Sequence, residues 1–180
     1  MFAFKKVSKY ANVEIPEPVR KTEASAGYDM VAAEDIFIPS YWSIMDDIKA
    51  NVLDWQDYKT LDQMAAITKQ YYDKPTLIPT GYKAYMDKNY YLQLSIRSSS
   101  PLKYWLILAN GVGVIDADYA DNSSNEGHIY FQVINLSPCP LYIKAGEVIG
   151  QATFIPYGVT DDDKAEGDRT GGFGSTGTTL

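Results

Sequence analysis

Short apolar runs, broken every few residues by Gly, Pro, Asn or Asp, make up most of this 180-residue sequence. Residues 90–97 alternate cleanly, and the period of two places Leu92 and Leu94 on one face of a strand. A second alternation covers residues 129–133. Short strands separated by turn residues are typical of a sandwich or barrel, whereas parallel α/β folds place helices between their strands. The sequence therefore predicts an all-β fold.

A tight turn is expected in the C-terminal half of the chain. The segment Lys144–Glu147 separates two apolar runs, Leu141–Ile143 and Val148–Phe154. A four-residue link that contains glycine is typical of a β-hairpin. We therefore expect the two runs to be neighbouring strands that pair with each other.

The stretch Ser43–Tyr72 breaks the period of two. Its apolar residues recur at three- to four-residue spacing, as on one face of a helix. They are Ile44, Ile48, Val52, Trp55, Leu61, Met64 or Ala65, Thr68 and Tyr71. Ser43 and Thr60 are each followed three residues later by Asp or Gln, a pattern typical of helix N-terminal caps. The sequence thus predicts two short helices in an insert at about residues 41–75.

The composition changes near residue 158. Asp161–Asp163 and the glycine-rich Gly171–Gly177 offer few side chains that can pack in a core. We expect a β domain over residues 1–157 and a flexible, glycine-rich C-terminal arm over residues 158–180. Such an arm would become ordered on a ligand or on a partner subunit.

The charge balance and the single cysteine exclude several kinds of partner and site. The net charge of −7 argues against a nucleic-acid polymer as ligand, because proteins that bind one concentrate Lys and Arg. Cys139 is the only cysteine, which excludes an intramolecular disulfide and a cysteine-cluster metal site. The sequence has no run of about 18 apolar residues, so we expect no contact with a membrane and a cytoplasmic location.

Five segments carry the residues suited to chemistry. They are Ser25–Met30, Arg97–Lys103, Asn110–Tyr119, Ala145–Gln151 and Gly171–Gly177. In this order they resemble the five sequence motifs of the trimeric dUTPase family, and the resemblance covers nearly the whole chain. It implies a jelly-roll-like β fold and a homotrimer with active sites at the subunit interfaces. Each site would take its first, second and fourth motifs from one chain, its third from a neighbour and its fifth from the remaining chain.

The resemblance implies a dUTP diphosphatase, which hydrolyses dUTP to dUMP and pyrophosphate, keeps uracil out of DNA and supplies dUMP for dTMP synthesis. Hydrolysis of a phosphoanhydride needs a positioned water, a base and groups that hold the phosphate charge. Asp116 matches the family's catalytic carboxylate, which directs water at the α-phosphorus. The implied cofactor is Mg²⁺, held by the substrate phosphates and water rather than by side chains. The helical insert is compatible with a phage or bacterial member, and a phage-encoded protein would act in the host cytoplasm.

The resemblance also assigns the residues that bind substrate. Uracil and the sugar would be bound by Asn110, Gly113, Val114, Ile115 and Tyr119. The ring of Tyr119 would lie against the deoxyribose and exclude a 2′-hydroxyl, and the stretch Val114–Tyr119 would be a hairpin with Asp116 at its tip. The phosphates would be bound by Arg97, Ser98, Ser99 and Gln151, with Arg97 mainly paired to Asp29 in support of the site. The arm would contribute Arg169, Phe173, Gly174 and Ser175, with Phe173 closing over the uracil ring.

Some residues depart from the family pattern or have no role in it. Arg169 stands one residue closer to the paired glycines than the family's arginine does, and we still expect it to bind phosphate. The loop Asp121–Glu126 lengthens the third motif and has no assigned role. His128, the only histidine, is expected on a surface strand, and Lys103 is expected to be a solvated surface lysine.

Two alternatives remain open. A dCTP deaminase shares the fold and the nucleotide type, but it needs a glutamate in place of Asp116 to move protons on the cytosine ring. The other alternative is a nucleotide-sensing interaction protein, in which the dUTP site controls the binding of a protein regulator to the 41–75 insert. Deleting residues 43–72 would then remove the partner and leave turnover intact.

Overall fold

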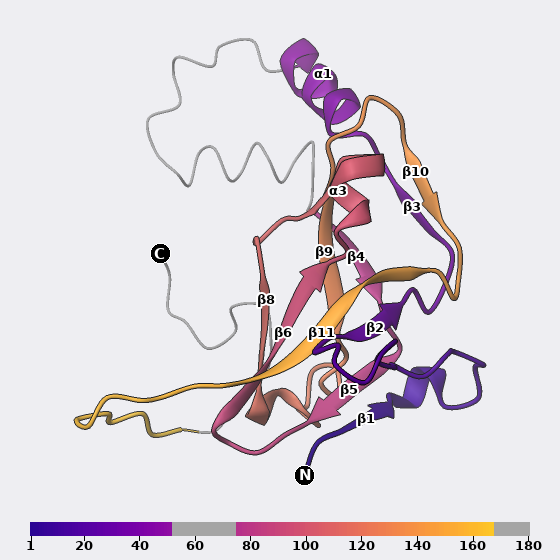
Figure 1. Cartoon of the computed structure of the whole chain (residues 1–180). Coiled ribbons are helices and arrows are strands. Elements are labelled where there is room, and N and C mark those ends of the chain that lie inside the picture. Colours follow the sequence, from indigo (N-terminus) through magenta and orange to yellow (C-terminus); the bar gives the residue numbers. More distant parts are fainter. Residues whose placement is uncertain (52–74, 168–180) are drawn as a thin grey trace.

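The computed structural model describes residues 1–51 and 75–167 (Figure 1). The strands are β1 (Ala3–Lys6), β2 (Tyr28–Val31), β3 (Ile36–Ile38), β4 (Thr76–Pro79), β5 (Tyr82–Tyr85), β6 (Tyr90–Ile96), β7 (Leu106–Leu108), β8 (Gly113–Asp116), β9 (Tyr130–Asn135), β10 (Leu141–Ile143) and β11 (Val148–Pro156). The α-helices are α1 (Tyr41–Asn51) and α3 (Ser99–Tyr104), and η1 (Ser8–Tyr10) and η3 (Ala117–Tyr119) are short 3-10 helices. The predicted all-β fold is confirmed. None of the helices in the two described ranges is long and apolar enough to cross a membrane.

Two antiparallel sheets enclose the core. One has the strand order β2-β11-β6-β8 and the other the order β4-β9-β7, while β1 pairs with β5 and β3 with β10. The alternation expected in β6 is confirmed, because Leu92 and Leu94 are fully buried between the sheets. Phe131 and Val133 of β9 face them from the other layer and are also fully buried. The period of two therefore identified the core faces of both central strands.

A glycine lets the two sheets approach closely at the centre of the core. A Cβ at Gly150 of β11 would lie 2.1 Å from Phe131 Cε1 and 2.6 Å from the carbonyl oxygen of Ser95. Real side chains do not tolerate either distance, so this position can hold only glycine while Phe131 keeps its place. The phenyl ring fills the space that a side chain at position 150 would take.

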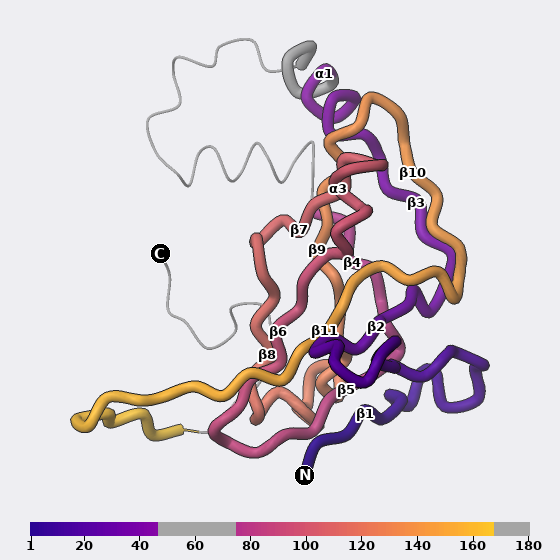
Figure 2. The backbone as a smooth tube through the Cα atoms, in the orientation of Figure 1, coloured from indigo at the N-terminus to yellow at the C-terminus, as the bar shows by residue number. Residues whose placement is uncertain are grey.

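The predicted hairpin around Lys144–Glu147 is wrong. The strand β10 pairs with β3, and β11 pairs with β2 and β6, so the two runs do not pair with each other. Residues 141–152 instead run antiparallel to residues 28–38 as one long bent ribbon (Figure 2). The turn is a local feature of this ribbon, where Gly146 N–H donates to the carbonyl oxygen of Ala32 at 2.8 Å. The turn residues were correctly located, but they do not determine which strand lies alongside.

The first predicted helix of the insert exists, with a different cap. The helix α1 begins at Tyr41, and the hydroxyl of Ser40 accepts a hydrogen bond from Trp42 N–H at 3.2 Å. Ser40 therefore caps the helix, and Ser43, the predicted cap, lies inside it. Ser40 Oγ also donates to the carbonyl oxygen of Ser137 at 2.6 Å, so the helix start is tied to the loop before β10.

Other parts of the predicted insert and arm lie outside the described residues. The second helix, expected from Thr60, falls within residues 52–74. The described part of the arm, residues 158–167, is exposed and holds no helix or strand. The division into a domain over residues 1–157 and an arm over 158–180 stays a prediction.

The short helix α3 was not predicted. It directly follows β6 in the second of the five motifs, and Pro101 fits its first turn, where a missing N–H costs no helical hydrogen bond. The helix ends at Tyr104, and the next residue, Trp105, has a φ of 53° in the left-handed region. The phosphate-binding serines expected in this motif therefore lie at the start of a helix rather than in a loop.

Candidate active site

The central strand β11 brings the first, second and fourth motifs together. Its residue Gln151 lies opposite Asp29 of β2 on one side and opposite Ser95 of β6 on the other. The second motif begins with Arg97, two residues beyond Ser95 and directly after the end of β6. Segments far apart in the sequence thus meet at one end of the four-stranded sheet.

Gln151 and Asp29 are joined by a hydrogen bond across the two strands. Gln151 Nε2 donates to Asp29 Oδ1 at 3.0 Å, and Asp29 is buried. A Cβ at Gly27 would lie 3.0 Å from Gln151 Oε1, so the glycine leaves room for the amide to lie across the first motif. The amide nitrogen carries two hydrogens, and the second remains able to donate to a ligand.

The expected pairing of Arg97 with Asp29 is not found among the contacts of the described residues. Asp29 is contacted by Gln151 and, at 3.9 Å, by Lys21 Nζ, while the Arg97 side chain is exposed. The physical reason lies in the register, because Gln151 is directly opposite Asp29 and reaches it first. Lys21 was missed in the sequence, since nothing local places a residue of the N-terminal loop beside β2.

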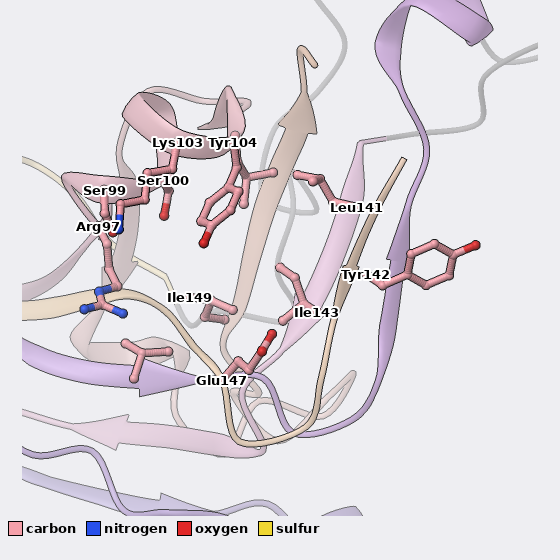
Figure 3. A pocket seen from close by; sticks show the side chains of 12 residues that line it. Arg97, Ser99, Ser100, Lys103, Tyr104, Leu141, Tyr142, Ile143, Glu147 and Ile149 are labelled. Carbon is pink, nitrogen blue, oxygen red and sulfur yellow. The ribbon is translucent and has the colours of Figure 1, made fainter. Parts of the chain in front are cut away.

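Arg97 borders a cavity of about 430 Å³ between α3 and the start of β11 (Figure 3). Its lining combines basic and hydroxyl side chains from the second motif with apolar side chains from β7, β10 and β11. The lining residues are Arg97, Ser99, Ser100, Lys103, Tyr104, Leu106, Leu141, Tyr142, Ile143, Glu147, Val148 and Ile149. Two cations beside serine hydroxyls are suited to hold an anion such as a phosphate chain. Ser98, expected beside Ser99, is exposed and does not line this cavity.

Lys103 also lines the cavity, although it was expected to be only a solvated surface lysine. It lies four residues after Ser99, and residues at this spacing share one face of a helix. The side chain is exposed as predicted. The four-residue spacing between Ser99 and Lys103 indicates that both line the same cavity. This inference requires knowing that α3 is a helix.

The third motif forms the edge strand β8. Asp116 lies opposite Tyr91, and Gly113 lies opposite Leu94, where a Cβ on the glycine would come within 2.9 Å of the Leu94 Cβ. Along β8 the predicted base-binding residues differ in exposure, with Gly113 buried, Ile115 half-buried and Val114 exposed. Asn110 and the catalytic candidate Asp116 are exposed as well.

The strand register separates Asp116 from the second motif. Asp116 lies opposite Tyr91 of β6, and Arg97, directly after the end of β6, is six residues beyond Tyr91. At about 3.3 Å per residue this places the two residues on the order of 20 Å apart. One copy of the chain does not bring the candidate catalytic carboxylate to the residues that are expected to bind phosphate.

Tyr119 is held by hydrogen bonds inside the chain. Its hydroxyl donates to the carbonyl oxygen of His128 at 3.1 Å and accepts from Asn125 Nδ2 at 2.7 Å, and 6% of the residue is exposed. The expected hairpin over Val114–Tyr119 is wrong, since β8 pairs with β6 and residues 117–119 form the 3-10 helix η3. After the helical turn that follows Asp116, the Tyr119 hydroxyl is directed into the protein.

His128 was expected on the surface, and this prediction is wrong. It is 3% exposed, and Nε2 accepts a hydrogen bond from Gly81 N–H at 2.9 Å. Burial, with a smaller contribution from Lys9, lowers the pKa of His128 to about 4. The imidazole is therefore neutral at pH 7 and supports the packing around Tyr130, whose ring centroid lies 4.1 Å away.

The described residues contain no group of three or more His, Cys, Asp and Glu side chains that could hold a metal ion. The predicted arm residues Arg169, Phe173, Gly174 and Ser175 fall within residues 168–180, outside the described part of the chain. The described part of the site therefore consists of Asp116 on β8 and, at the other end of the sheet, hydroxyl, amide and basic groups together with the carboxylates of Asp29 and Glu147.

Comparison with known proteins gives consistent matches. The family model described as dUTPase matches residues 62–177. A deoxyuridine 5'-triphosphate nucleotidohydrolase of Lactococcus lactis is 41% identical over 177 residues, which cover 97% of this chain and 96% of that protein. The crystal structure of the dUTPase from Streptococcus mutans matches with a TM-score of 0.66 and 33% identity, covering 88% of this chain and 98% of that one. A mutant of the dUTPase from phage phi11 of S. aureus matches with a TM-score of 0.59 over 93% of this chain and 97% of that one, and at 15% identity this likeness shows the fold alone.

Proposed function

Because the chain belongs to the dUTPase family, we propose that it hydrolyses dUTP to dUMP and pyrophosphate at sites assembled from more than one copy of the chain. The observation that carries this proposal is the separation along β6. Asp116 of β8 lies opposite one end of β6, and Arg97 follows the other end. A site that needs both residues takes Asp116 from one chain and Arg97 from its neighbour.

Asp116 activates the attacking water. Its carboxylate accepts a hydrogen bond from the water, orients the lone pair of the water oxygen toward the α-phosphorus and takes the proton as the new P–O bond forms. The bond between the α-phosphorus and the bridging oxygen breaks, and pyrophosphate leaves. A positioned general base of this kind accelerates such a step by roughly 10²–10⁴-fold.

The second and fourth motifs hold the phosphate chain. Arg97 supplies a guanidinium charge, Ser98 and Ser99 supply hydroxyl and backbone N–H groups, and Gln151 supplies an amide N–H. Donors that are fixed before the reaction stabilise the charge that builds up in the transition state without having to reorganise. Asp29 fixes the Gln151 amide for this purpose through the 3.0 Å hydrogen bond.

The third motif binds the nucleoside. In the order β2-β11-β6-β8 the strand β8 is at the edge of the sheet, so it has β6 on one side only. Along an edge strand every second residue turns its backbone N–H and C=O outward, and the stretch Gly113–Ile115 would offer such groups to the uracil edge. Asn110 adds a side-chain amide, and the ring of Tyr119 lies against the deoxyribose.

The assembly is a homotrimer in this proposal. One chain supplies Asp29, Arg97 and Gln151, a neighbour supplies Asp116, and the arm of the remaining chain supplies Arg169, Phe173, Gly174 and Ser175. Phe173 covers the uracil ring, while the other arm residues contact the phosphates.

Mg²⁺ fits this site as part of the substrate complex. The absence of a carboxylate cage among the described residues is compatible with an ion that is held by phosphate oxygens and water, as Mg²⁺ usually is in nucleotide sites. The ion would neutralise phosphate charge. The related phage phi11 enzyme is described with a structural Mg(II) ion.

Incubation of the purified protein with dUTP and with dCTP tests the function. We expect pyrophosphate and dUMP from dUTP and no ammonia from dCTP. Ammonia from dCTP without pyrophosphate from dUTP would identify a deaminase and refute the proposal. A cytoplasmic location and a regulator that binds the 41–75 insert stay predictions, and only residues 41–51 and 75 of that insert are described.

A further inference from the structure

The loop Asp121–Glu126, which has no role in the sequence motifs, is connected to Tyr119 by its side chains. Asn125 Nδ2 donates to Tyr119 Oη at 2.7 Å, and the same hydroxyl donates to the carbonyl oxygen of His128 at 3.1 Å. Asn122 Nδ2 donates to the backbone oxygen of Tyr119 at 2.8 Å. Both the main chain and the ring end of Tyr119 are thus held by the asparagines of one loop.

The orientation of the Asn125 amide follows from its other contacts. Its Oδ1 accepts from Asn122 Nδ2 at 2.8 Å and from Gly127 N–H at 3.1 Å. Because the oxygen is occupied by two N–H donors, the amide presents its nitrogen to Tyr119. The bond to the phenol therefore has one direction, from Asn125 to Tyr119.

The two ends of the loop are anchored to the N-terminal part of the chain and to β5. Asp121 accepts from Lys83 Nζ and, at 2.7 Å, from Tyr85 Oη. Glu126 Oε2 accepts from the backbone N–H of Ser8 at 2.9 Å and from its hydroxyl at 3.0 Å. Hydrogen bonds from Lys83 and from Ser8 lower the pKa of Asp121 and of Glu126 respectively, so both carboxylates are ionised at neutral pH. The loop is a fixed support rather than a loose connection.

We propose that Asn125 is a positioning residue for sugar selection, which holds the Tyr119 ring as an apolar wall against C2′ of the substrate. This inference rests on the proposed function, which places Tyr119 against the deoxyribose. The Tyr119 hydroxyl already has a donor and an acceptor within the chain, so it is not directed at the sugar. A ribonucleotide would bring its 2′-hydroxyl against the ring carbons, where it loses water and gains no partner. UTP is rejected for that reason, and the rejection depends on the ring staying in place.

The substitution Asn125→Leu tests the bond with little change in volume. Leucine can neither donate to Tyr119 Oη nor accept from it, whereas an aspartate would accept a hydrogen bond from the phenol and keep the link. We expect the ratio of kcat/KM for dUTP to kcat/KM for UTP to fall by roughly tenfold. Asn12→Leu is the matched control, because it makes the same chemical change on an exposed residue and should leave the ratio as in the wild type.

A double-mutant cycle with Tyr119→Phe separates positioning from general destabilisation. Without the hydroxyl, the ring loses its link to Asn125, so Asn125→Leu should change the ratio no further in this background. An unchanged ratio in Asn125→Leu whose melting temperature shows that it is folded would overturn the inference, as would additive effects in the cycle. If Asn125→Leu does not fold, Tyr119→Phe alone decides, because it should show the same loss of selectivity. A wild-type protein that releases no pyrophosphate from dUTP would instead refute the proposed function itself.

Discussion

Gln151 Nε2 donates to Asp29 Oδ1 over 3.0 Å, and this hydrogen bond joins the fourth motif to the first across the β11–β2 pair. The carboxylate of Asp29 is buried, so it acts on a ligand only through the amide that it holds. Through this bond the inaccessible Asp29 would influence the proposed contact between Gln151 and the phosphates.

Removing this carboxylate should weaken substrate binding. Asp29→Ala leaves the Gln151 amide without its buried acceptor, and a lost hydrogen bond to a charged group costs about 1.5–3 kcal/mol. We expect kcat/KM for dUTP to fall by roughly tenfold to a hundredfold, with KM changing more than kcat. Lys21→Ala is the control, since Lys21 lies 3.9 Å from the same carboxylate and is itself exposed, so its effect should be small. Equal losses in both variants would contradict the role given to the Asp29–Gln151 bond.

Two inactive variants should restore activity when they are mixed. Asp116→Asn removes the proposed base, and Arg97→Ala removes a proposed phosphate-binding cation, yet a shared site can combine the intact residue of each. Co-refolding the two variants in equal amounts should recover about one quarter of the wild-type sites, because each site needs one suitable chain at each of two positions. Pyrophosphate release measures the recovery. No recovery from mixed oligomers, verified by differentially tagged chains, would show that both residues act within one chain.

Stability should fall as the pH drops from about 6.5 to about 4. His128 is neutral in the fold, where burial lowers its pKa to about 4, and the unfolded chain binds a proton near pH 6.5. The stabilisation is therefore complete above pH 6.5 and is lost as the pH falls toward 4, by roughly 3 kcal/mol in the free energy of unfolding.

Urea unfolding at several pH values measures this loss. His128 is the only histidine, so His128→Gln should be less stable than the wild type at pH 7. Its free energy of unfolding should also change little between pH 6.5 and 5. Asp121 and Glu126, whose pKa values are lowered in the fold, lose their contributions only at more acidic pH. If the free energy of unfolding of the wild type does not change with pH above pH 5, the assignment of this pH dependence to His128 is disproved.

A methyl group at position 150 should disrupt the core. In Gly150→Ala the new Cβ meets Phe131 Cε1 at 2.1 Å and the Ser95 carbonyl oxygen at 2.6 Å, and the second atom is backbone that cannot move aside. We expect the free energy of unfolding to drop by about 2 kcal/mol or more. Gly158→Ala is the matched control, because nothing lies within 4 Å of its Cβ position and no change in stability is expected. Equal melting temperatures for the two variants would contradict the close approach of β11 to Phe131.

The sequence patterns predicted which face of a strand is buried more reliably than they predicted which strands pair with each other. Leu92 and Leu94 were assigned to the core from their alternation, and they are buried. The turn at Lys144–Glu147 was located, yet its flanking strands pair with β2, β3 and β6 instead of with each other. Alternation is a local property of a strand, whereas its partners come from distant parts of the chain.

The sequence by itself determined the all-β class, the family and the identity of the motif residues, because these depend on side-chain type and order along the chain. Only the tertiary structure decided where those residues meet. The β6 register puts Asp116 about 20 Å from Arg97, and the Asp121–Glu126 loop folds back so that Asn125 reaches Tyr119. The first relationship arises from strand pairing and the second from the folding back of a loop. Both depend on contacts that no local sequence pattern encodes.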